Sequence, residues 1–69
     1  MRVTYFNQDG TWCLGRLSQS RIPNLEEKIK ITDSYDDSNF TGFVDRIETH
    51  IILQPKPTEE YIIYLKAKK

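Results

Sequence analysis

The residues best suited to chemistry lie in one stretch of the chain, residues 37–48. Carboxylate, amide and hydroxyl oxygens recur there, and Gly42 stands among them, where glycine permits a sharp turn. Such oxygens are the ligands that hard divalent cations prefer, calcium above all. If the segment folds as a closed loop, its candidate metal ligands are Asp37, Asn39, Thr41, Asp45 and Glu48.

Residues 37–48 resemble the calcium-binding loop of an EF-hand. The resemblance makes Asp37 the first ligand, Glu48 the closing bidentate ligand and Gly42 the turn residue. An EF-hand loop lies between two helices, however, whereas Ile29 and Ile31 upstream alternate with lysines as in a strand. A polar turn that leads into a β-strand is therefore the first interpretation, and calcium binding is the alternative.

Nucleophilic and zinc chemistry would have to use Cys13 and His50, because the chain has one residue of each type. A cysteine nucleophile needs a base within hydrogen-bond distance, and Cys13 is expected in mid-strand beside Phe6. One cysteine and one histidine cannot complete a zinc site in a single chain. The three glycines are scattered and form no phosphate-binding loop. We expect no catalytic residues, no cofactor and no enzymatic activity.

Aromatic side chains are the remaining candidates for a binding surface, since eight of the 69 residues are Phe, Tyr or Trp. A core of this size cannot enclose every ring, and small β domains use surface aromatics to hold peptides or stack bases. The formal net charge is zero, which disfavours a nucleic-acid partner because phosphate binding needs basic surface. We therefore expect a protein partner or a second copy of the chain. The candidate partner-binding residues are Tyr5, Phe6, Trp12 and Tyr64.

These side chains must be positioned by β-strands, because β-branched and aromatic residues dominate the composition. Asp9-Gly10 separates two alternating segments and predicts a hairpin with a type I′ turn. That turn sets Phe6 opposite Cys13 and Tyr5 opposite Leu14. One face would then carry Val3, Tyr5, Trp12 and Leu14, and the other would carry Thr4, Phe6, Cys13 and Leu17.

The rest of the chain also favours strands. Residues 28–32 alternate, residues 40–53 suit one bent strand or two short ones, and Asn24 to Glu27 resembles a capping box that permits one helical turn. Residues 61–65 suit a strand, and a short C-terminal helix over 58–66 is the alternative, because its acids and lysines would match a helix dipole.

The segment Gly42-Phe43-Val44-Asp45-Arg46-Ile47, between Ile29-Lys30-Ile31 and Ile51-Ile52-Leu53, is similar in its apolar spacing to small SH3-like and Sm-like barrels. Residues 28–65 resemble the YolD-like proteins, which are small bacterial and prophage-associated chains. The resemblance concerns the fold alone and implies no activity.

Length and composition complete the prediction. Residues 1–69 suit a single domain, and no apolar segment approaches the roughly 20 residues of a membrane span. A single cysteine indicates a reducing compartment, so we expect a cytoplasmic protein. The sequence predicts a mostly β domain of about five strands, an antiparallel barrel or twisted sheet of SH3-like type. The expected function is a non-enzymatic interaction or accessory module, of the phage or prophage kind, that binds a protein or forms a homodimer. Calcium binding and single-stranded nucleic-acid binding are the second and third hypotheses.

Overall fold

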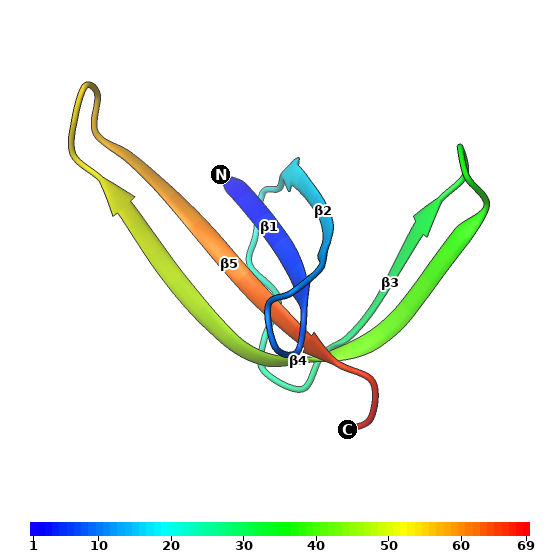
Figure 1. Cartoon of the computed structure of the whole chain (residues 1–69). Helices are drawn as coiled ribbons and strands as arrows, with labels where there is room; N and C mark the ends of the chain where they lie inside the picture. The colour runs from blue at the N-terminus through cyan, green and yellow to red at the C-terminus, as the bar shows by residue number, and fades with distance from the viewer.

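The structure, a computed structural model, describes residues 1–69 and contains strands but no helix. Strands account for 61% of the residues and form one five-stranded sheet in the order β2-β1-β5-β4-β3 (Figure 1). The strands are β1 (Arg2–Asn7), β2 (Cys13–Ser18), β3 (Lys28–Asp33), β4 (Ser38–Ile52) and β5 (Thr58–Lys66). The mostly β prediction is confirmed, and residues 58–66 are a strand. No helix that could cross a bilayer is present.

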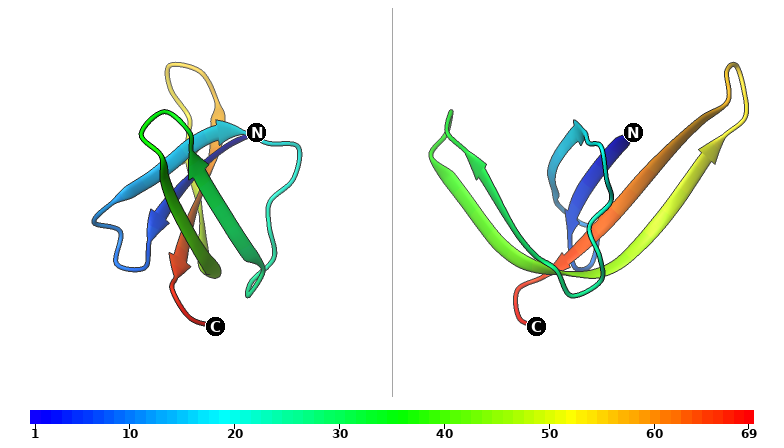
Figure 2. Two further views of the ribbon diagram at one scale, coloured as in Figure 1. Left: turned by 90° about the vertical axis from the view of Figure 1, so that its right-hand side faces the viewer. Right: turned by 180° about the vertical axis from the view of Figure 1, so that it is seen from behind.

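β4 organises the sheet because it is 15 residues long and has two successive partners. Its first part pairs with β3 and its second part pairs with β5, both in antiparallel fashion. The strand curves between these parts, so two hairpin arms diverge, with β1 and β2 between them (Figures 1 and 2). One bent strand over residues 38–52 therefore covers nearly all of the predicted segment 40–53, as the first of the two alternatives predicts.

The predicted barrel is not closed. β2 and β3 are the two edges of the sheet, and each has a single neighbour. The prediction of an antiparallel sheet is also wrong at one pair, since β1 and β5 run parallel, with Tyr5 beside Ile63. A parallel pair needs a long crossover, and here β2, β3 and β4 all lie between the two strands in sequence.

The core lies on one face of the sheet and consists of residues from the three central strands. Alternation places the largest of these side chains on the same side, where they lose contact with water. The fully or almost fully buried apolar residues are Val3, Tyr5, Val44, Ile63 and Leu65. Ile29, Ile31 and Leu14, which come from the two edge strands, pack against this cluster and are only partly buried.

The first hairpin differs from the predicted one in its turn and in part of its register. Gly10 has a φ of 78°, but Asp9 does not have a positive φ, so the turn is not type I′. Phe6 pairs with Cys13 as predicted. Tyr5 then pairs with Gly15, because a register shift between Tyr5 and Phe6 leaves Leu14 without a partner.

This irregularity in β2 changes which residues share a face. Leu17 pairs with Val3 and therefore lies on the core face, whereas the sequence predicts it beside Phe6. Trp12 lies in the loop before β2 and is 72% exposed, so it does not join the face of Val3 and Tyr5. A bulge adds one residue to a strand and reverses the alternation beyond it, which local sequence alternation does not reveal.

The segment before β3 forms a turn, not a helix. The backbone N–H of Asn24 donates to the Glu27 carboxylate at 3.0 Å, as a capping box would. Glu26 has a φ of 67°, which is incompatible with a continuing helix. The turn instead docks on β4, where Glu26 N–H donates to the Val44 carbonyl at 2.8 Å.

Candidate functional site

A groove of about 590 Å³ lies between β2 and β3, the two edges of the open sheet. Its volume is within the range of roughly 300–1,000 Å³ that is common for ligand sites. Both edge strands contribute apolar and polar side chains to it. The lining residues are Tyr5, Leu14, Gly15, Arg16, Leu17, Gln19, Ile29, Lys30, Ile31, Thr32 and Asp33.

The backbones of β2 and β3 are free on the sides that face this groove. β2 pairs only with β1, and β3 pairs only with β4. Since β1, β5 and β3 run in one direction and β2 and β4 run in the other, the two edges are antiparallel to each other. A row of unpaired N–H and C=O groups on an edge strand is a template for pairing with another strand.

Tyr5 lies at the bottom of the groove and is 5% exposed. Its hydroxyl donates a 2.6 Å hydrogen bond to Oε1 of Gln19. Burial raises the pKa of Tyr5 above its ordinary value, so the hydroxyl keeps its proton and donates at neutral pH. The buried Tyr5 hydroxyl is thus satisfied by Gln19 among the apolar side chains at the bottom of the groove.

Basic side chains from both edges line the groove. Arg16 lies on β2, and its Nε donates to Oγ1 of Thr4 at 3.1 Å. Lys30 lies on β3, at the opposite edge of the same groove. Neither Arg16 nor Lys30 forms an ion pair within the chain, so their charges are available to a ligand. Asp33, at the end of β3, is the one acidic residue among the lining residues.

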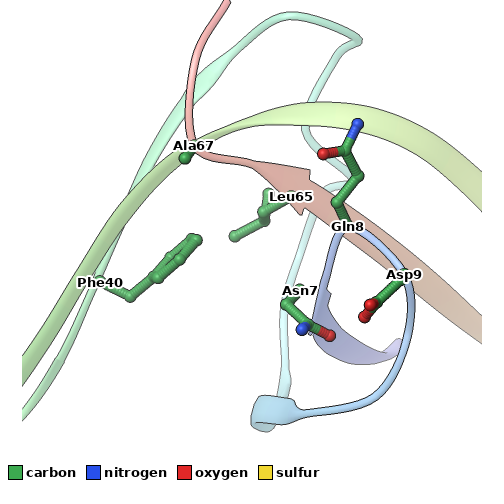
Figure 3. A pocket seen from close by; sticks show the side chains of 6 residues that line it. All are labelled: Asn7, Gln8, Asp9, Phe40, Leu65 and Ala67. Atoms are coloured by element: carbon green, nitrogen blue, oxygen red, sulfur yellow. The ribbon is translucent and has the colours of Figure 1, made fainter.

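A second hollow, of about 370 Å³, lies beside the first hairpin loop and the C-terminal end of β5 (Figure 3). Leu65, Phe40 and Ala67 form its apolar part. Two of its three polar side chains, those of Asn7 and Asp9, are engaged elsewhere, and Asp9 accepts from Thr11. The Asn7 side chain donates to Thr11 and accepts from the Trp12 N–H, at 2.9 Å in both cases. This hollow therefore offers fewer free groups to a ligand than the groove between β2 and β3.

The four predicted partner-binding residues do not form one patch. Tyr5 lies in the groove on the core face, whereas Phe6 and Tyr64 lie on the opposite face of the sheet. The rings of Phe6 and Tyr64 stack with their centroids 5.9 Å apart. Trp12 stands alone in the hairpin loop. Alternation along β1 separates Tyr5 from Phe6, since neighbouring residues in a strand point to opposite faces.

The predicted metal ligands are likewise not brought together. Asp37 lies in the turn between β3 and β4, and the other four residues are distributed along β4, which is extended. Because a strand rises about 3.3 Å per residue, the two ends of the segment lie far apart. Glu48 accepts a hydrogen bond from the Tyr64 hydroxyl at 3.0 Å. No group of three or more His, Cys, Asp or Glu side chains could hold a metal ion, and the segment does not form an EF-hand loop.

Cys13 and His50 lie on different strands and have separate surroundings. Cys13 is a free, exposed cysteine at the start of β2 and pairs with Phe6. His50 is exposed near the end of β4, where it pairs with Glu60.

Most of the groove residues are not predicted as site residues from the sequence, although Ile29 and Ile31 are predicted on one face of a strand. A signal was present in β3, where Lys28 and Lys30 alternate with these isoleucines. Lysines of this kind are typical of edge strands, because they protect an open edge from accidental pairing. That β2 is the other edge strand depends on the strand order of the whole sheet, which no local sequence pattern indicates.

No family model, no curated protein and no solved structure matches this chain. The resemblance to SH3-like and YolD-like proteins therefore stays a prediction.

Proposed function

We propose that this chain is a non-enzymatic protein-interaction module that binds an extended segment of a partner protein as an added strand between β2 and β3. One observation carries the proposal: a single groove has a free sheet edge on each side. A bound strand would pair with one edge in antiparallel fashion and with the other in parallel fashion, since the edges run in opposite directions.

Strand addition is an established mode of peptide recognition in proteins. Main-chain hydrogen bonds supply affinity, and pockets for alternate side chains supply specificity. Each edge strand is six residues long, which corresponds to about 20 Å of extended peptide. Leu17, 48% exposed on β2, and the partly buried Ile29 and Ile31 on β3 would gain burial against such a peptide.

The module is proposed to work in the cytoplasm as an accessory protein. Cys13 is its one cysteine and is exposed. An exposed free thiol is stable in a reducing compartment and prone to oxidation outside one.

Selection from a peptide library tests the proposal and does not require the partner to be identified. A random decapeptide library displayed on phage would be selected against the immobilised protein. Enriched peptides, made synthetically, would then be titrated into ¹⁵N-labelled protein. We expect the amide resonances of β2 and β3 to shift most, because these strands would gain backbone hydrogen bonds.

Two matched variants separate groove binding from adhesion to any apolar surface. Leu17→Asp places a charge in the groove, and Leu53→Asp makes the same change at a residue that is 70% exposed between β4 and β5. We expect Leu17→Asp to weaken peptide binding at least about tenfold and Leu53→Asp to leave it unchanged. Equal effects of the two variants, or shifts confined to other strands, would contradict the proposal.

A further inference from the structure

We infer that the strand accepted by the groove alternates between apolar residues, which face the core, and acidic residues, which face solvent between Arg16 and Lys30. The inference rests on the proposed function and names the chemistry of its partner. It follows from the faces on which the side chains of the two edges lie.

The core-facing positions of the two edges are mostly apolar, and Gly15 on β2 and Asp33 at the end of β3 are the exceptions. On β2, Leu17 pairs with the fully buried Val3. On β3, Ile29 pairs with the buried Gly42, and Ile31 pairs with Phe40, which packs against the core. A strand added between these edges must place every second side chain beside these residues. Those side chains are expected to be apolar, because a polar group buried there would lack a partner.

The solvent-facing positions of the same edges are basic or uncharged, and none is acidic. Arg16 pairs with Thr4 on the outer face, and Lys30 pairs with the exposed Thr41. Neither cation has an acidic partner within the chain. Opposite charges on neighbouring strands stabilise a sheet and like charges destabilise it. A strand flanked by cations on both sides is therefore expected to present carboxylates outward.

The same charges disfavour two other arrangements, direct pairing of β2 with β3 and insertion of a strand from a second copy. Direct pairing of β2 with β3 would bring basic outer faces together, which agrees with the open sheet. A second copy that offered its own β2 or β3 would likewise add cations beside cations. The favoured occupant is an acidic segment of another protein.

Three synthetic heptapeptides that differ only in their outward residues test the inference. The first is Glu-Val-Glu-Ile-Glu-Val-Glu, and the others replace every Glu by Gln or by Lys. Binding would be measured by fluorescence anisotropy at low and high salt. We expect the Glu peptide to bind best, the Lys peptide to bind worst, and the difference to shrink at high salt because exposed charges are screened.

Matched variants assign the preference to the two cations. Arg16→Gln with Lys30→Gln removes two positive charges from the groove, and Lys56→Gln with Lys68→Gln removes two elsewhere. We expect only the first pair to weaken Glu-peptide binding, by about threefold to tenfold, without change for the Gln peptide. Lys30→Gln alone serves as a second variant, because the Lys30 side chain forms no ion pair that folding could require.

The outcomes separate the inference from the proposed function. If library-selected peptides shift β2 and β3 but lack outward acids, or if the Gln or Lys peptide binds as well as the Glu peptide, the inference is wrong and strand addition stands. If no peptide, selected or synthetic, shifts β2 and β3, both fail. Light scattering that shows a dimer disrupted by Leu17→Asp would identify a second copy as the occupant and overturn the inference.

Discussion

Arg46 lies over the ring of Tyr64, with its guanidinium carbon 3.8 Å from the ring centroid. The two residues are paired across β4 and β5 because β4 shifts its register between Val44 and Arg46. Phe6 of β1 stacks on the same tyrosine, and Glu48 accepts a 3.0 Å hydrogen bond from its hydroxyl. Tyr64 thus joins three neighbouring strands on the face opposite the core.

Loss of the cation from this stack should destabilise the fold. A cation over an aromatic ring at an exposed site is worth about 0.5–1 kcal/mol. We expect Arg46→Ala to lower the free energy of unfolding by about that amount, as measured by urea denaturation. Arg46→Lys should retain part of the stability. Lys56→Ala, in the turn between β4 and β5, serves as the control and should have no effect, and an equal loss there would contradict the role of the stack.

Gly42 is required by close packing in the middle of β4. A Cβ atom at this position would lie 2.7 Å from the Lys66 carbonyl oxygen and 2.8 Å from a ring carbon of Phe40. We expect Gly42→Ala to destabilise the protein by about 1–3 kcal/mol, because the backbone of β5 would have to move.

Gly15 is the matched control, since a Cβ atom there would meet nothing within 4 Å. Gly15→Ala should be neutral or stabilising by up to about 1 kcal/mol, because alanine restricts the unfolded chain. Thermal denaturation of both variants measures the contrast. A similar melting temperature for the two would show that the close approach at Gly42 is absent in solution.

Adjacent isoleucines on β5 should differ sharply in their tolerance of substitution. Ile63 is fully buried, whereas Ile62 lies on the other face and is partly exposed. Truncation of a buried isoleucine to alanine costs about 2–5 kcal/mol, which is comparable with the whole stability expected of a 69-residue domain. We therefore expect Ile63→Ala to unfold the protein and Ile62→Ala to leave it folded, as seen in far-UV circular dichroism. If Ile62→Ala unfolded the protein and Ile63→Ala did not, Ile62 and not Ile63 would lie on the core face of β5.

An ion pair between Arg21 and Glu27 should make stability depend on acid pH. Arg21 donates to both carboxylate oxygens, at 3.2 and 2.6 Å. The hydrogen bonds from Arg21, with that from the Asn24 N–H, hold the pKa of Glu27 below its ordinary value. A depressed pKa stabilises the fold above the unfolded-state pKa, and the contribution disappears as the pH falls through the folded-state pKa.

The comparison of wild type with Glu27→Gln isolates this effect. We expect the variant to be less stable at pH 7 and the difference to vanish well below about pH 4, where the glutamate is protonated in both states. Urea denaturation at a series of pH values measures it. A constant difference across the range would assign the effect to packing and not to the charge.

The positions of the strands were predictable because they depend on local patterns. Alternating isoleucines identified β3, and β-branched and aromatic residues identified β4 and the Tyr61 to Leu65 part of β5. The first hairpin was predictable from Asp9-Gly10. The candidate site was predictable only in part. Tyr5 lies in the groove, whereas Phe6 and Tyr64 lie on the opposite face and Trp12 lies in a loop.

The sequence by itself determined that this chain forms strands, and roughly where each begins and ends. The tertiary structure alone decided the parallel pairing of β1 with β5, the shifts near Leu14 and Asp45, and the open edges of β2 and β3. The physical reason is that strand propensity and alternation act over a few residues. Strand order and register arise from packing between segments distant in sequence, and one bulge reverses every face beyond it. The groove also depends on the tertiary structure, because β2 and β3 lie on either side of it only when all five strands have paired in this order.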